Sequence, residues 1–182
     1  MKAIIFVLFS LIVLNVTAQK HKATFYLFDG TIKEGYTRYP GFATNLKYWE
    51  TEDSKPEKYS VNELDKLVIT VKGKERTYIF RDVLEYDHTL VLEELIVGRI
   101  STYRSVFTKS FYGHNNPIYF LKRTLPNGYE EIVPTWLIQR KFKKTGAEYF
   151  KDCPEISSKI KNKEYKRKDL FQVVVRYNTY CK

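Results

Sequence analysis

The two cysteines, Cys153 and Cys181, are the residues of this chain with the clearest potential for chemistry. The three histidines, His21, His88 and His114, all lie outside the segment that the cysteines bracket. A zinc site needs about four ligands at suitable spacing, and a redox-active cysteine pair usually forms a C-x-x-C motif. The pattern therefore favours a structural disulfide between Cys153 and Cys181 over a metal centre or a reactive thiol.

Acid and base groups are concentrated at Asp87-His88 and Glu93-Glu94. The sequence shows no third residue that would orient them for catalysis. It also contains no G-x-S-x-G motif, no H-E-x-x-H motif and no glycine-rich phosphate loop. We therefore predict no catalytic residue, no metal and no cofactor. A small hydrolase-like enzyme with a cleft around Asp87 and His88 is the alternative hypothesis.

Basic residues gather near the C-terminus. The chain has 31 lysines and arginines against 21 acidic residues, a net charge of +10. Two runs are candidate anion-binding sites: Arg140, Lys141, Lys143 and Lys144, then Lys166, Arg167 and Lys168. Such runs attract polyanions by releasing counterions, but they are also typical of an ordinary solvated helix face. Lysine outnumbers arginine, which argues against specific recognition of nucleic-acid phosphates.

Aromatic residues are abundant, with 15 Tyr, 12 Phe and 2 Trp. Most of them alternate along segments that read as strands, where core and cross-strand positions are expected. Tyr48, Trp49 and Trp136 are the residues whose exposure would indicate stacking on a ligand.

The first 18 residues have the pattern of a secretory signal peptide. Lys2 supplies a positive start, residues 3–14 are apolar, and small residues follow at 16–18, where a signal peptidase cleaves. The apolar run is too short to span a bilayer, and no later run is longer. We expect an exported protein, periplasmic or secreted, with no transmembrane segment after cleavage. Two cysteines in such an oxidising compartment most often form a disulfide.

Residues 22–134 are rich in Tyr, Phe, Val, Ile and Thr, in short runs separated by turn signals. Glycine-containing turns at Asp29-Gly30, at residues 72–74 and at residues 125–128 predict three β-hairpins. The segment 88–107 is compatible with strands, or with a short helix that leads into a strand. The region as a whole predicts an antiparallel sheet or a small barrel.

After residue 134 the periodicity becomes helical. Ile138, Phe142 and Tyr149 share one face at helical spacing, with basic residues opposite them. This predicts one amphipathic helix from residue 135, weakened by Gly146 and ended before Pro154.

A short turn or helix over residues 154–162 comes next. Leu170, Val174, Tyr177 and Cys181 then lie on one face of a predicted last helix. Cys181 therefore points inward with the apolar residues, and the charges point outward.

These elements predict an α+β fold, in which an antiparallel β-sheet or small barrel is followed by a C-terminal helical lobe. The expected divisions are a cleaved signal peptide at residues 1–18, a β-rich region at 22–134 and a basic helical lobe at 135–182. We expect the disulfide to close the helical lobe, and the lobe to pack on the sheet as one unit.

The end of the chain resembles the tail of uncharacterised exported proteins of Bacteroidota-type bacteria. The matching segments are D-C-P at 152–154, S-x-K-I at 157–160, K-x-Y at 163–165 and V-x-x-Y-N-x-x-C at 174–181. The T-A-Q at 17–19 and the D-G-T-I-x-x-G-Y at 29–36 are similar to that group as well. The resemblance implies export and this architecture, and it implies no catalytic residue.

We therefore expect a non-enzymatic exported or cell-envelope protein that acts as an interaction module. Its expected partner is an unknown protein or an anionic glycan or lipid, and nucleic acid is not expected.

Overall fold

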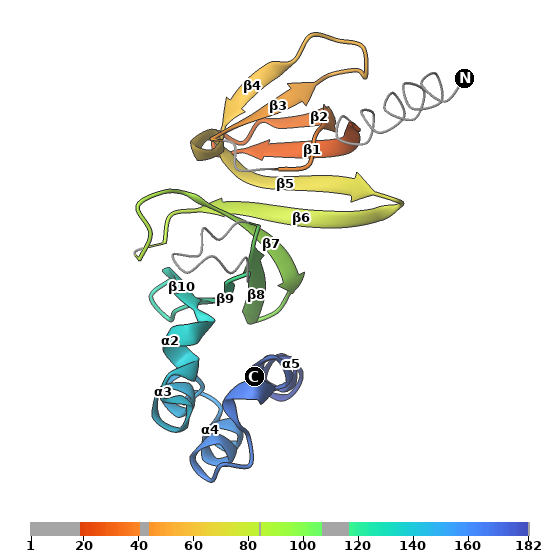
Figure 1. Ribbon diagram of the computed structural model, residues 1–182. Helices are drawn as coiled ribbons and strands as arrows, with labels where there is room; N and C mark the ends of the chain where they lie inside the picture. The colour runs from red at the N-terminus through yellow and green to blue at the C-terminus, as the bar shows by residue number, and fades with distance from the viewer. Residues whose placement is uncertain (1–18, 41–43, 84, 107–116, 182) are drawn as a thin grey trace, which may run out of the picture. The chain divides into compact units, whose positions relative to one another are not determined.

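The computed structural model describes residues 19–40, 44–83, 85–106 and 117–181 (Figure 1). The predicted signal peptide at residues 1–18 lies outside the described residues, and so does His114. Within the described ranges, no helix is long and apolar enough to cross a membrane.

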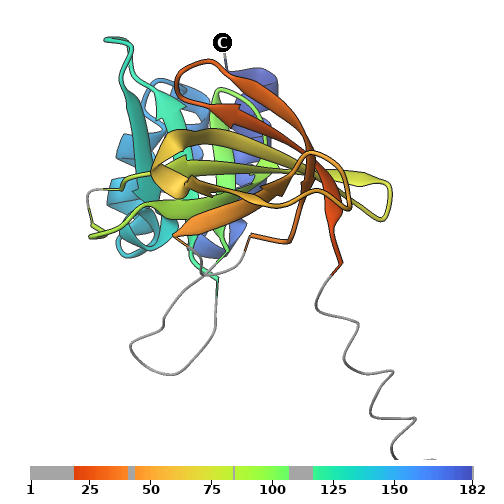
Figure 2. The ribbon, with the colours of Figure 1, turned by 90° about the horizontal axis from the view of Figure 1, so that it is seen from above.

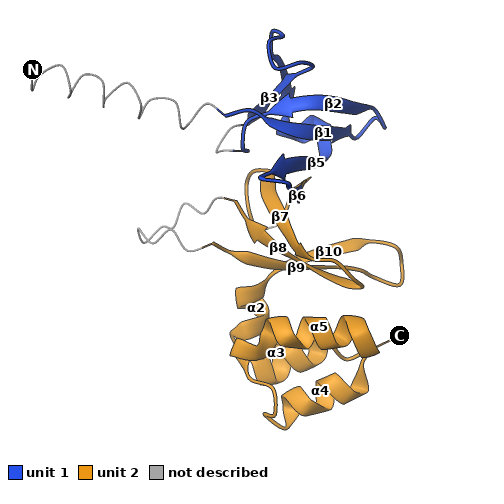
Figure 3. Cartoon of the chain, turned by 90° about the vertical axis from the view of Figure 1, so that its right-hand side faces the viewer, with its two compact units in different colours: residues 1–77 blue, residues 78–182 orange. Residues whose placement is uncertain are grey.

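The antiparallel strands follow one hydrogen-bonded order, β10-β9-β8-β7-β6-β5-β1-β2-β3-β4, and helices follow them in the chain. This confirms the predicted α+β class. The barrel alternative is wrong, because the order is open and does not close on itself. The chain divides into two compact units, residues 1–77 and residues 78–182 (Figure 3).

Unit 1 is built from strands that surround an aromatic and aliphatic core. Its elements are β1 (His21–Leu27), β2 (Ile32–Thr37), β3 (Asn45–Trp49), β4 (Glu57–Ser60), a 3-10 helix η1 (Val61–Glu63), β5 (Leu64–Val71) and the start of β6 (Lys74–Arg81). Phe25 is fully buried, and its ring lies 5.3 Å from the ring of Tyr48. Tyr48 and Trp49 are each only 5% exposed, so neither offers a face for ligand stacking.

The predicted hairpins of unit 1 form at glycines that adopt positive φ. Gly30, between β1 and β2, has φ 87°, and the amide of Thr31 donates to Asp29 Oδ1 at 2.8 Å. Lys72 and Gly73, between β5 and β6, have φ 51° and 75°. Positive φ at two successive turn residues is the geometry of a type I′ turn, which matches the twist of the flanking strands.

Unit 2 continues β6 and adds four strands. They are β7 (Leu90–Ile96), β8 (Ile100–Ser105), β9 (Tyr119–Thr124) and β10 (Glu130–Pro134). The described part of the segment 88–107, residues 88–106, thus forms two strands and not a helix that leads into a strand. Gly128 has φ 84° in the β9–β10 turn, as the predicted third hairpin requires.

Helices follow β10 in the described part of unit 2. They are α2 (Thr135–Gln139), α3 (Phe142–Tyr149), α4 (Pro154–Lys161), a 3-10 helix η2 (Arg167–Asp169) and α5 (Leu170–Tyr180). In Figure 1 they form one group below the strands of unit 2, and in the view from above in Figure 2 they lie behind those strands. The group shares a core with the sheet, since fully buried Ile100 of β8 and Leu121 of β9 lie in the same cluster as Leu170, Val173 and Val174 of α5.

The single helix predicted from residue 135 to the Cys153-Pro154 step is wrong, because the chain forms α2 and α3 there. Lys141 leaves the helical region, with φ −132° and ψ 56°. In a continuous helix the carbonyl of Ile138 would accept from the amide of Phe142. Instead it accepts from the Thr145 hydroxyl at 2.6 Å, so a side chain satisfies the carbonyl that the break leaves open.

Candidate functional site

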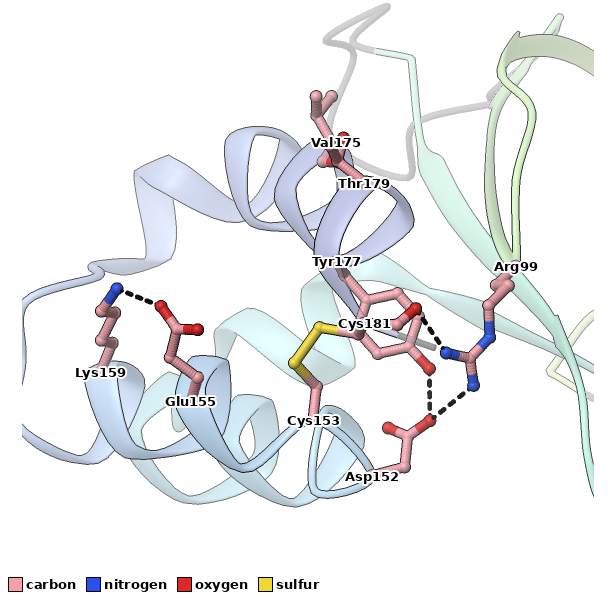
Figure 4. The surroundings of a disulfide bond; sticks show 9 residues. All are labelled: Arg99, Asp152, Cys153, Glu155, Lys159, Val175, Tyr177, Thr179 and Cys181. Atoms are coloured by element: carbon pink, nitrogen blue, oxygen red, sulfur yellow. Dashed lines mark hydrogen bonds and ion pairs between the residues drawn. A yellow bond between two sulfur atoms is a disulfide. The ribbon is translucent and has the colours of Figure 1, made fainter.

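The two cysteines form the predicted disulfide. Cys153 and Cys181 are bonded, with their Cα atoms 5.7 Å apart. Cys153 immediately precedes α4, and Cys181 immediately follows α5, so the bond ties the start of one helix to the end of the other (Figure 4). The thiols are consumed in this bond, and the described residues contain no group of three or more His, Cys, Asp or Glu that could hold a metal.

A polar network surrounds the disulfide. It joins the two halves of the tail motif, which are D-C-P at 152–154 and V-x-x-Y-N-x-x-C at 174–181. Arg99 donates from Nη1 to the carbonyl of Cys181 at 2.7 Å and pairs through Nη2 with Asp152 at 3.5 Å (Figure 4). The Tyr177 hydroxyl donates to the same Asp152 oxygen. Burial, together with this bond to a carboxylate, raises the pKa of Tyr177 to about 12. Asp152 of D-C-P is therefore bound to Tyr177 of Y-N-x-x-C, with Arg99 as the third member.

Asn178, the next residue of the motif, joins α5 to the start of β8. Its Nδ2 donates to the carbonyl of Ile100 at 2.8 Å, and its Oδ1 accepts from the amide of Ile100 at 2.9 Å. Gly98 lies so close to this amide group that a Cβ there would be 2.3 Å from Asn178 Nδ2. The tail motif thus forms a structural clamp. Its partners are Gly98, Arg99 and Ile100, which no pattern in the sequence indicates.

The first basic run lines a groove on α3 and α4. This open groove, which we call the lysine groove, has a volume of about 710 Å³. Its lining residues are Lys141, Phe142, Lys143, Lys144, Glu148 and Lys161. Glu148 pairs with Lys151 at 2.7 Å, and this contact lowers the pKa of the Glu148 carboxyl.

The groove contains three of the predicted anion-binding residues and one that was missed. Lys161 joins it from α4, where it alternates with Lys159 and Lys163 and so belongs to no contiguous basic run. Arg140 and the second run, residues 166–168, are exposed but do not line the groove. The two runs are nevertheless neighbours, because Gln139 Nε2 donates to the carbonyl of Arg167 at 3.2 Å.

The acid and base groups around Asp87 do not form an enclosed site. Asp87 and His88 are 97% and 66% exposed and contact each other at 2.8 Å, a contact that lowers the pKa of Asp87. Glu93 is instead buried and paired with Arg104, and Glu94 accepts from the Tyr103 hydroxyl at 3.2 Å. Solvated groups of this kind lack the desolvation that tunes catalytic acids and bases.

Comparison with protein-family models, with curated proteins and with solved structures gives no match in any of the three. The lysine groove, with the chemistry of its side chains, is the feature of the molecule that points to a function.

Proposed function

We propose that the protein is an exported or cell-envelope binding module whose lysine groove holds the anionic groups of an envelope glycan or lipid. The observation that carries the proposal is the charge of the groove lining, four lysines against one glutamate. The glutamate is already paired with Lys151, whereas none of the four lysines makes an ion pair with another described residue. An anionic ligand would supply the missing counter-charges.

Lysine suits such a ligand for a physical reason. Its ammonium is a compact, hydrated point charge on a flexible stem, so a row of lysines follows repeated anionic groups without fixed geometry. Each basic side chain near an anionic membrane surface contributes about 1 kcal/mol of binding free energy. The neighbouring residues 166–168 lie next to the end of α2 and would add long-range attraction within roughly 10 Å at 0.1 M salt.

The binding proposal is tested by removing two charges from the groove. In Lys143→Gln/Lys144→Gln, we expect affinity for anionic-lipid vesicles or for heparin to fall about thirtyfold, equivalent to ~2 kcal/mol. The matched control is Lys55→Gln/Lys58→Gln, which removes two exposed lysines of unit 1. The vesicle and heparin measurements distinguish a lipid from a glycan.

Two outcomes count against the binding proposal. One is an equal loss of affinity in the groove variant and the control variant, which would show that only net charge matters. The other is binding that does not weaken as salt is raised, because an electrostatic complex must lose affinity as counterions accumulate.

Export is the second part of the proposal, and it rests on the leader at residues 1–18. Full-length protein expressed in a bacterium should appear in the envelope fraction or the medium with its leader removed. Intact-mass measurement should give a chain that begins at Gln19 or Lys20. A chain in the cytoplasm that retains Met1 would contradict export without affecting the groove experiment.

A further inference from the structure

A second cavity lies within unit 2, beside the disulfide network. It has a volume of about 670 Å³, within the range of small-molecule sites. Three cations line it: Arg99 from the β7–β8 turn, Arg123 from β9 and Lys151 from the segment after α3. The register of the sheet brings the arginines together, because Ile100, the residue after Arg99, pairs with Arg123. We call this cavity the arginine pocket.

The lining of the arginine pocket has an excess of positive charge. Asp152 is its single acidic residue, so three cations and one carboxylate leave an excess of two positive charges. Asp152 already accepts from Arg99 and from the Tyr177 hydroxyl. Carboxylates also pair with the other two cations, Glu131 with Arg123 at 2.7 Å and Glu148 with Lys151 at 2.7 Å. Neither of these glutamates lines the pocket.

Both arginines are fixed in place yet keep unused donors. Arg123 donates from Nε to Glu131 and from Nη1 to the carbonyl of Tyr149 at 2.6 Å, and its guanidinium lies 4.1 Å from the Tyr149 ring centroid. Arg99 donates to Cys181 and Asp152 and lies 5.1 Å from the Tyr177 ring centroid. A guanidinium has five N–H donors. Bonds to other described residues engage two donors on each arginine, which leaves three on each.

This arrangement is preorganised for an oxyanion. A planar guanidinium presents pairs of N–H groups that match carboxylate or phosphate oxygens, and one that is already immobilised loses little entropy on binding. Leu125 and Pro126, from the β9–β10 turn, add an apolar wall. The volume exceeds what a bare ion needs, so the wall has room to contact the uncharged body of an organic anion.

We propose that the arginine pocket binds a small organic acid, whose carboxylate or phosphate group contacts Arg99, Arg123 and Lys151. The body of the ligand lies against Leu125 and Pro126. The lining of this site is distinct from that of the lysine groove, and the ion pair between Lys151 and Glu148 connects the two. The groove attracts extended polyanions, whereas the pocket selects one oxyanion in fixed geometry.

The test uses the mature protein with its disulfide intact and three sugar probes in calorimetric or NMR titration. D-glucuronate carries a carboxylate, glucose 1-phosphate carries a phosphate, and glucose is the neutral control. Lys151→Gln should weaken binding of the acidic probe about tenfold or more, the effect of losing one charge-assisted hydrogen bond. Its matched control is Lys159→Gln, which removes a similar helix-surface ion pair, with Glu155, at 2.6 Å. Arg123→Lys keeps the charge but loses the planar guanidinium with its paired N–H donors, and we expect about tenfold weaker binding or more.

Binding of glucuronate that these variants weaken supports a carboxylate ligand, and the same result with glucose 1-phosphate supports a phosphate ligand. The proposal is overturned if neither acid binds at millimolar concentration, or if glucose binds equally well. It is also overturned if Lys151→Gln and Lys159→Gln have the same effect. Thermal unfolding shows whether the Arg123→Lys variant is folded. If it is not, Lys151→Gln decides the test, because Lys151 is exposed. Lys143→Gln/Lys144→Gln should leave this binding unchanged. A loss as large as that of Lys151→Gln would assign the acid to the lysine groove and overturn the pocket.

Discussion

The side chain of Asn178 makes the two hydrogen bonds to Ile100 that a neighbouring strand would otherwise supply. Both backbone groups of Ile100 are thereby satisfied at the start of β8, next to the fully buried side chain of the same residue. Leaving a buried backbone group without a partner costs about 1–3 kcal/mol. The asparagine therefore contributes to the stability of unit 2 through the groups it satisfies.

Asn178→Ala should lower the free energy of unfolding of unit 2 by about 2 kcal/mol, because it leaves an amide and a carbonyl of β8 unpaired. Urea unfolding followed by circular dichroism measures the change. Thr179→Ala is the matched control one residue further on. Among the described residues its hydroxyl donates to the carbonyl of Val175 in its own helix, so a change within about 0.5 kcal/mol is expected. Equal losses in the two variants would refute the role of the clamp.

Tyr177 makes the stability depend on pH in the alkaline range. Its pKa is raised to about 12 by burial and by the bond to Asp152, against about 10 in an unfolded chain. The folded state therefore keeps a proton that the unfolded state loses. The contribution of Tyr177 to the free energy of unfolding is therefore fully present below pH 10 and is lost as pH rises toward 12.

Unfolding free energies measured from neutral pH to about pH 11 should fall less steeply in Tyr177→Phe than in the unmodified protein. The variant lacks the titrating group, although at neutral pH it is less stable because it loses the bond to Asp152. Tyr103, whose pKa burial also raises to about 12, contributes a slope common to both proteins. Parallel pH profiles would contradict the assignment to Tyr177.

The residues of the tail motif could be identified from the sequence, but their partners could not. Cys153 and Cys181 were paired by elimination, since the chain offers no other thiol. Arg99 lies in the β7–β8 turn and Arg123 in β9, both among many basic residues, and the β8–β9 register places them beside each other. Their proximity is determined by the pairing of strands that are distant in the sequence, so no local sequence pattern indicates it.

At the level of helices and strands, Gly146 shows why local propensity is an incomplete guide. Glycine inside a helix is less favourable than alanine by about 1 kcal/mol, so the sequence predicts a weak point in α3. The structure gives it a packing role: a Cβ at this position would lie 2.6 Å from a ring atom of Phe142. Phe142 is 7% exposed and belongs to the helical core, so its ring has little room to move.

Gly146→Ala should therefore destabilise unit 2 by about 1–3 kcal/mol, despite the gain in helix propensity. Combining it with Phe142→Leu should restore part of the loss, because the smaller side chain leaves space for the new methyl group. The measurement is a double-mutant cycle of unfolding free energies. If Gly146→Ala alone stabilises the protein, the close contact with Phe142 is not limiting.

The hairpins were predicted and the break between α2 and α3 was not, and the difference is physical. A positive φ restricts the residue type strongly, so Gly30, Gly73 and Gly128 mark their turns in the sequence. The break at Lys141 contains neither glycine nor proline. The hydrogen bond from the Thr145 hydroxyl to the carbonyl of Ile138 joins α3 to α2 across the break, and no turn residue marks it in the sequence.

At the scale of the whole chain, composition and contacts divide the protein differently. Composition changes after residue 134, where strands give way to helices. The division between the compact units falls after residue 77, and strands β7–β10 belong with the helices because they share a core with them. Secondary-structure type can be predicted from local sequence, whereas the pairing of buried faces requires the tertiary structure. The disulfide, the lysine groove and the arginine pocket all belong to unit 2.

The disulfide should consequently stabilise unit 2 rather than unit 1. Closing a loop between Cys153 and Cys181 contributes roughly 3.5 kcal/mol in the chain-entropy model. The two tryptophans give a separate reporter for each unit, since Trp49 lies in β3 and Trp136 in α2. In Trp49→Phe, the fluorescence transition of Trp136 should shift to lower urea concentration when the disulfide is reduced. In Trp136→Phe, the transition of Trp49 should stay nearly unchanged. Equal shifts in both variants would show that the units unfold together, and that the loop-closure free energy is shared by the whole chain.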